Sequence, residues 1–110
     1  MKKIIKRNGE FLNIAEARAL CKKVKEVFPF VQSSEHLSVC GYPTEEAAKN
    51  ANLQNVVNAH KGYIFTFIGC EYVSNTPDHN DGYRVLVIGF KELPPAPNFE
   101  EKFPNYIIIG

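Results

Sequence analysis

The sequence predicts a single α+β domain in which two helices accompany an antiparallel or mixed sheet, in the approximate order ββ-α-β-α-β-β-β. Two copies of the pattern G-Y-x-x-x-x-I-G, beginning at Gly62 and Gly82, are the expected arms of one hairpin. Two other stretches show apolar residues at helical spacing behind a capping residue. A chain of 110 residues that is 45% hydrophobic and 23% charged suits one globular domain over residues 1–110.

Residues 4–12 predict a short opening hairpin. Asn8 and Gly9 favour a type I′ turn, because both central positions of that turn need positive φ and its twist matches that of paired strands. Apolar residues stand on both sides of this turn. We therefore expect residues 4–7 and 10–12 to pair as strands.

A first helix is expected from Asn13 to about Phe28, where Pro29 ends it. Asn13 stands three residues before Glu16, the spacing of a capping box, in which each side chain bonds the other residue's backbone N–H. The predicted apolar face consists of Ile14, Ala17, Leu20, Cys21, Val24 and either Val27 or Phe28.

The middle of the chain predicts a short strand and a second helix. Residues 32–35 indicate a loop, and the alternation over residues 36–40 indicates a strand. Thr44 is the expected cap of a helix that runs to about Ala59. Residues 50–60 of this helix include five amide side chains and no Asp, Glu, Lys or Arg.

Residues 63–73 and 83–91 are apolar on both faces, which is typical of central strands in a sheet. Two helices can cover one face, so loops, the opening hairpin or a second copy of the chain would have to cover the other. A homo-oligomer is therefore one expectation. The prolines of residues 93–98 predict a stiff extended connector, and residues 106–110 predict a buried closing strand in this sheet or a neighbour's.

The composition argues against several classes of protein. The three cysteines are odd in number and far apart, which disfavours a zinc site or a disulfide framework and favours a reducing cytoplasm. No stretch has the apolar length of a secretion signal or a membrane span, so we expect a soluble protein with no membrane partner. No phosphate loop, nucleophile elbow or zinc-protease motif occurs, so neither an enzyme nor a cofactor is expected.

The tip of the predicted hairpin gathers four polar residues: Asp78, His79, Asn80 and Asp81. Oxygen and imidazole ligands of this kind can hold a divalent ion, but the spacing does not match a calcium loop. The same residue types are also the ordinary residues of turns. We favour the turn, with no metal ligand and no catalytic residue.

The preferred functional hypothesis is a non-catalytic protein-binding module. Uncharged amides are cheaper to desolvate than charged groups, so an amide-rich helix surface suits a partner interface. An ordinary solvated helix surface accounts for the same residues and is slightly preferred. The candidate contacts are Asn50, Gln54, Asn58, Lys61, Asp78 and His79. Short stand-alone chains of this kind often serve phages or mobile elements, assembling with or occluding a partner protein.

The alternative hypothesis is nucleic-acid binding. Residues 1–27 hold eight basic and three acidic side chains, a net charge of +5, whereas the remainder nets −4. Phosphate recognition needs such clusters. Mutual neutralisation of the two parts in the folded chain is the preferred explanation of this asymmetry. The candidate phosphate contacts are Lys6, Arg7, Arg18, Lys22 and Lys25.

Overall fold

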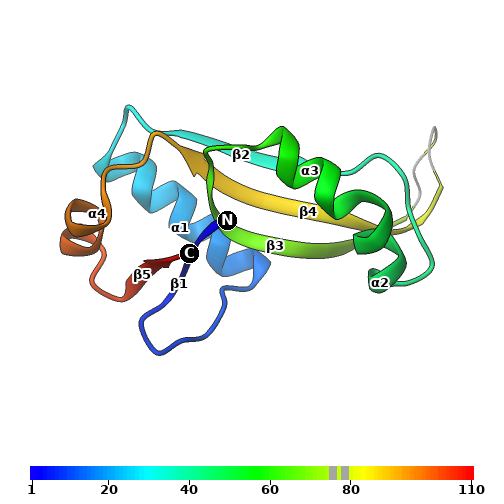
Figure 1. The fold of residues 1–110 in the computed structure, drawn as a ribbon, viewed down its shortest axis with the longest axis horizontal. Helices are drawn as coiled ribbons and strands as arrows, with labels where there is room; N and C mark the ends of the chain where they lie inside the picture. The colour runs from blue at the N-terminus through cyan, green and yellow to red at the C-terminus, as the bar shows by residue number, and fades with distance from the viewer. Residues whose placement is uncertain (75–76, 78–79) are drawn as a thin grey trace. The chain divides into compact units, whose positions relative to one another are not determined.

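The computed structural model describes residues 1–74, 77 and 80–110 and confirms the α+β class, with a mixed five-stranded sheet (Figure 1). The strand order is β2-β4-β3-β1-β5. The strands are β1 (Lys2–Lys6), β2 (Gln32–Leu37), β3 (Ile64–Val73), β4 (Gly82–Lys91) and β5 (Tyr106–Ile109). The helices over these residues are α1 (Ile14–Val27), a middle helix made of α2 (Glu45–Ala48), η1 (Lys49–Leu53) and α3 (Gln54–Ala59), and α4 (Ala96–Lys102).

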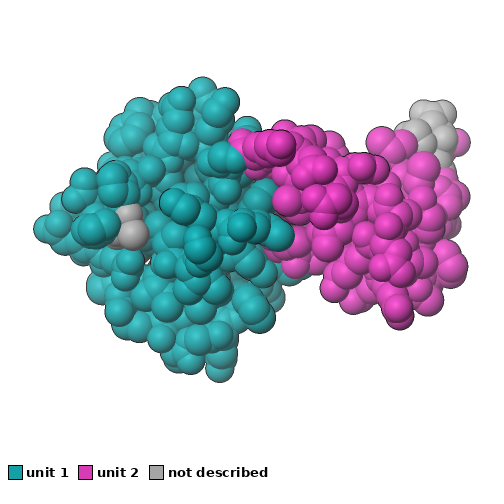
Figure 2. Space-filling model, in the orientation of Figure 1, with its two compact units in different colours: residues 1–34, 62–67, 88–110 teal, residues 35–61, 68–87 magenta. Residues whose placement is uncertain are grey.

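Contacts within the chain form two compact units (Figure 2). Unit 1 comprises residues 1–34, 62–67 and 88–110, and unit 2 comprises residues 35–61 and 68–87. Strands β2, β3 and β4 each contribute residues to both units. Each unit is described by itself below, and the single globular domain remains a prediction.

In unit 1, the expected opening hairpin is wrong: of its two arms, only the first is a strand. A turn forms, but it is not the predicted type I′ turn: the Gly9 N–H donates to the Lys6 carbonyl over 2.9 Å, so Arg7 and Asn8 are its central residues, and only Gly9, at φ 94°, has a positive φ there. Residues 10–12 form no strand, although the Lys6 N–H donates to the Glu10 carbonyl over 2.9 Å. Strand β1 instead runs parallel to β3, with Lys2 opposite Ile64, and antiparallel to β5.

Helix α1 confirms the predicted capping box. The Asn13 side chain accepts a hydrogen bond from the Glu16 N–H over 2.8 Å, and Glu16 Oε1 accepts one from the Asn13 N–H over 3.1 Å. These two bonds satisfy backbone donors that the first helical turn leaves without partners. The helix buries Ala17, Leu20 and Val24 on one side.

The proline-rich connector is extended only over residues 93–95, because α4 begins at Ala96. Proline is tolerated in the first turn of a helix, since the N–H that it lacks would have no partner there. Helix α4 is fixed by two buried aromatic rings, Phe99 and Phe103, which stack with centroids 5.2 Å apart. The three prolines therefore predicted an extended connector where part of the chain forms a short helix.

The predicted closing strand is confirmed within the chain's own sheet, where β5 pairs with β1. The expectation that its isoleucines are buried is wrong. Ile107 and Ile108 are half-buried, and Ile109 is 38% exposed. The cause is its position, because β5 is the last strand in the sheet.

Strand β2 spans Gln32–Leu37, so the prediction of a loop over 32–35 and a strand over 36–40 is wrong. Alternation alone could not locate the strand, since its pairing with β4 decides where it lies. Ser38 ends the pairing: its N–H donates to the Val85 carbonyl, while its hydroxyl accepts the Val85 N–H, each over 2.9 Å. The Ser38 hydroxyl thus accepts the Val85 N–H in place of a backbone carbonyl.

Strands β3 and β4 match their predicted ranges to within one residue and are central in the sheet, as expected. Every residue of β4 from Arg84 to Phe90 is buried. Both faces of this strand are therefore covered within the chain. A second copy is not needed to cover β4.

We expect Asn13→Ala to lower the free energy of unfolding by about 1 kcal/mol, the usual cost of losing an N-terminal cap. Asn13→Ser is the matched control, because serine can accept the same bond and should lose only a few tenths of a kcal/mol, roughly. Urea denaturation at neutral pH measures both. Equal losses for the two variants would show that capping does not set the effect.

Candidate functional site

The middle helix positions the candidate partner-binding residues. The Thr44 hydroxyl accepts a hydrogen bond from the Ala47 N–H over 3.1 Å, which confirms the predicted cap. The helix turns Ala48 and Val56 inward, at 0% and 6% exposure, and His60 just beyond its end is also buried. This inward side leaves the opposite side of the helix on the surface.

We call the surface made of Asn50, Gln54 and Asn58 on this side, together with Lys61 in the turn just after the helix, the amide face. All four side chains are exposed. The Gln54 Nε2 donates to Asn58 Oδ1 over 2.9 Å, so two amides one turn apart hold each other in place. The predicted spacing therefore does produce one solvent-facing surface.

A π-helical turn, Lys49–Leu53, interrupts this helix and was not predicted. Turns of this kind use i→i+5 hydrogen bonds and are often found at functional positions. Asn52 lies within the turn, and its Nδ2 is buried without a hydrogen-bond partner among the described residues. An unsatisfied buried amide donor costs about 1 to 3 kcal/mol. Asn52 is one of the five amides of residues 50–60, but its side-chain nitrogen is buried in the protein.

The predicted partner contacts Asp78 and His79 lie outside the described residues. The neighbouring Asn80 has a structural role. Its Oδ1 accepts the Gly41 N–H over 3.0 Å, its Nδ2 donates to the Gly41 carbonyl, and its own carbonyl accepts Arg84 Nη2 over 3.0 Å. Within the described ranges, no three His, Cys, Asp or Glu side chains are placed to hold a metal ion.

Two histidines meet in unit 2, a contact that sequence reasoning missed. The rings of His36 and His60 lie with centroids 5.2 Å apart at 76° to each other. The His60 Nδ1 is 2.8 Å from the Val56 carbonyl. No sequence signal could have paired them, because they come from different elements, and two imidazoles fall short of the ligand set of a zinc site.

The environment of Cys70 does not favour a reactive thiol. It is half-buried, and burial raises the pKa of this thiol above its usual value of 9.0. Its Sγ contacts the Glu45 carbonyl at 3.6 Å. A thiol kept protonated in this way is a poor nucleophile.

The five candidate phosphate contacts divide into two groups. The first group, Lys6 and Arg7, is already paired with carboxylates. The Lys6 ammonium lies 2.5 Å from Glu16 and 3.7 Å from Glu10. Arg7 donates from Nε to the Pro104 carbonyl over 2.6 Å and from Nη2 to Glu100 over 3.3 Å. These contacts reduce the positive charge that either side chain can offer to phosphate.

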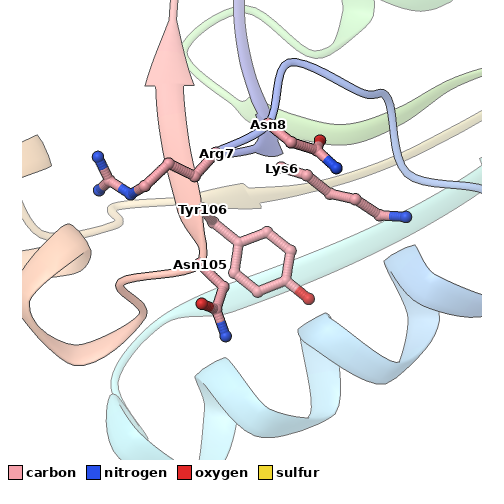
Figure 3. Close-up of a pocket in the computed structure, with 5 residues that line it drawn as sticks. All are labelled: Lys6, Arg7, Asn8, Asn105 and Tyr106. Carbon is pink, nitrogen blue, oxygen red and sulfur yellow. The ribbon is translucent and has the colours of Figure 1, made fainter.

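A pocket of about 350 Å³ lies beside these two residues and is also lined by Asn8, Asn105 and Tyr106 (Figure 3). Figure 3 shows the Lys6 and Arg7 side chains pointing to opposite sides, with the Tyr106 ring between them. Their cationic groups do not converge on one point. The pocket is therefore not arranged to hold a single anion.

The second group, Arg18, Lys22 and Lys25, is exposed along α1. Lys22 and Lys25 line a shallow pocket of about 440 Å³ together with Cys21, Glu26 and Ser33. The Glu26 carboxylate offsets part of their charge. We call Arg18, Lys22 and Lys25 the basic face.

No protein-family model matches this chain, and comparisons with curated proteins and with solved structures give no match either. Among the residues that the structure describes, no helix combines the length and the apolar character needed to cross a membrane.

The Lys6–Glu16 pair predicts a pH-dependent stability. The hydrogen bond from Lys6, followed by the one from the Asn13 backbone, holds the pKa of Glu16 below its usual value of 4.5. A carboxyl whose pKa is depressed by folding stabilises the protein fully above pH 4.5 and loses this effect as the pH falls through the folded-state pKa.

We therefore expect the stability advantage of the wild type over Glu16→Gln to shrink as the pH falls below 4.5 and through the lowered pKa of Glu16. Glutamine keeps the capping-box geometry, so the comparison isolates the charge. Urea midpoints across this pH range measure it, with Glu101→Gln as a control at an exposed carboxylate. A constant difference at all pH values would contradict the pairing.

Proposed function

We propose that this protein is a non-catalytic module that binds another protein through the amide face. The observation that carries the proposal is an exposed helix surface within residues 50–60, a stretch that contains no Asp, Glu, Lys or Arg. The cores of protein interfaces are depleted of charge, and amides lose less free energy than charged groups when water is removed. Apart from Lys61 at its end, the amide face is uncharged but polar, and such a surface suits reversible association.

The π turn gives separate support. A π turn inside an α-helix is rare and is frequently found at functional sites. Here it coincides with the amide-rich stretch and with the buried, unpartnered Nδ2 of Asn52. A sequence selected for stability alone would favour an apolar residue in place of that amide.

The proposal extends to Asp78 and His79 as further contacts, at positions outside the described residues. An accessory protein of a phage or mobile element, which assembles with or occludes a host protein, is the biological setting we propose. The small size of the chain and the absence of catalytic motifs from its sequence are consistent with that setting.

We expect Gln54→Lys to weaken partner binding at least about tenfold, because an ammonium group in the centre of the face must be desolvated. Stability should change by less than about 0.5 kcal/mol, since the side chain is exposed. Affinity purification from the native host with mass spectrometry identifies the partner, and calorimetry then compares the variants.

Gln32→Lys is the matched control, because Gln32 is also exposed and the substitution adds the same charge in unit 1. It should bind the partner with wild-type affinity. Equal affinities for Gln54→Lys and the wild type would remove the amide face from the interface. Equal losses for both substitutions would show that added charge acts non-specifically.

The basic face of α1 favours a second candidate, nucleic-acid binding. Its three side chains are exposed on one helix at spacings of four and three residues, which places them side by side. Helix α1 is also rigidly capped at Asn13. Lys6 and Arg7 contribute less than the sequence suggests, because each is paired with carboxylate.

If the second candidate is correct, affinity for a mixed-sequence oligonucleotide should fall steeply between low and physiological salt as counterions are released. Lys22→Glu combined with Lys25→Glu should abolish this binding, whereas Gln54→Lys should not weaken it. Fluorescence anisotropy against salt concentration measures both effects. Absence of binding at low salt would end this hypothesis.

A further inference from the structure

Strand β5 has one hydrogen-bonding edge occupied by β1 and one edge that faces away from the sheet (Figure 1). The antiparallel register places Ile4 opposite Ile108 and Ile5 opposite Ile107. The Arg7 N–H donates to the Asn105 carbonyl over 2.8 Å. Hydrogen-bonded and non-hydrogen-bonded residue pairs alternate along an antiparallel ladder. Arg7 and Asn105 form a bonded pair, so every second residue of β5 from Asn105 onward also bonds to β1.

It follows that the backbone of Ile107 and Ile109 bonds to β1, whereas the N–H and C=O of Tyr106 and Ile108 point to the outer edge. The Tyr106 N–H is used within the chain, where it donates to the Phe103 carbonyl over 3.1 Å. Ile108 therefore presents an outward donor and an outward acceptor at one residue. A residue of this kind can bond reciprocally to its own copy.

The side chains of β5 carry no charge, which distinguishes it from the other edge strand. Natural sheets protect their edges with charges, prolines and bulges. Strand β2, at the opposite edge, includes Glu35 and is mostly polar. Strand β5 reads Tyr-Ile-Ile-Ile, with high strand propensity and no protective residue.

We propose that β5 is a self-association edge, where a second copy of this chain adds its own β5 antiparallel across a two-fold axis through Ile108. Each Ile108 N–H donates to the Ile108 carbonyl of the other copy. A two-fold axis makes such an interface self-complementary and closes it at two subunits.

The same axis places Ile107 of one copy opposite Ile109 of the other, at a non-bonded position where side chains approach closely. Ile109 is 38% exposed and would lose exposed apolar surface on association. The contact is short, so the dimer should be weak and should form as the concentration rises. It uses neither the amide face nor the basic face.

Hydrogen exchange tests the proposal without any substitution. The Ile108 amide should exchange quickly in dilute protein and become protected in concentrated protein, together with a rise in mass by sedimentation. The Ile107 and Ile109 amides, which bond β1, should be protected at both concentrations. In a mixture of labelled and unlabelled protein, an intermolecular contact between the α-protons of Ile107 and Ile109 identifies the register.

Ile108→Pro and Ile108→Ala separate the backbone from the side chain. Proline removes the outward N–H together with the isoleucine side chain and is tolerated at the free side of an edge strand, so it should raise the dimer dissociation constant at least about tenfold. Alanine keeps that N–H and should raise the constant less than proline does. A monomeric mass with an unprotected Ile108 amide in concentrated protein overturns the proposal, and so does a dimer in which that amide stays unprotected.

Discussion

The pairing of β1 on both of its edges is the constraint on which unit 1 depends. Strand β1 receives β3 in parallel on one side and β5 in antiparallel on the other, so the beginning, middle and end of the described chain meet at Lys2–Lys6. Strand β3 pairs with Lys2 and Lys3, while the Lys6 N–H bonds the Glu10 carbonyl, so the hairpin predicted from Asn8 and Gly9 is reduced to its turn. The chain instead leaves the turn and enters the capping box of α1, whose Glu16 returns to Lys6 at the end of β1.

The parts of the fold that could be predicted from the sequence are those fixed by local chemistry. Asn13 and Thr44 cap helices because a side-chain oxygen satisfies a backbone N–H only three residues away. The β2 position, the α4 helix and the pairing of β1 could not be predicted. Each depends on a partner far along the chain, such as Val85 for Ser38 and the Phe28 ring for Phe103, and periodicity within a short window carries no information about that partner.

The candidate site also has some features that local sequence predicts and others that it does not. Helical spacing was enough to place Asn50, Gln54 and Asn58 on one exposed side, because exposure follows from the apolar residues opposite them. It could not foresee the π turn, which changes the geometry without an obvious breaker residue, nor the inward Nδ2 of Asn52. The His36–His60 contact depends on the tertiary arrangement of unit 2 and has no counterpart in the sequence.

The charge asymmetry of the sequence has a different meaning once the chain is folded. The positive segment and the negative remainder neutralise each other in part, since Arg7 pairs with Glu100 from the far end of the chain, while Lys6 pairs locally with Glu16 and Glu10. What remains exposed on α1 is the smaller basic face. An interaction there would be governed by counterions and screening, whereas one at the amide face would be governed by desolvation and fit. The two surfaces therefore differ in physical mechanism, and salt concentration alone can separate them.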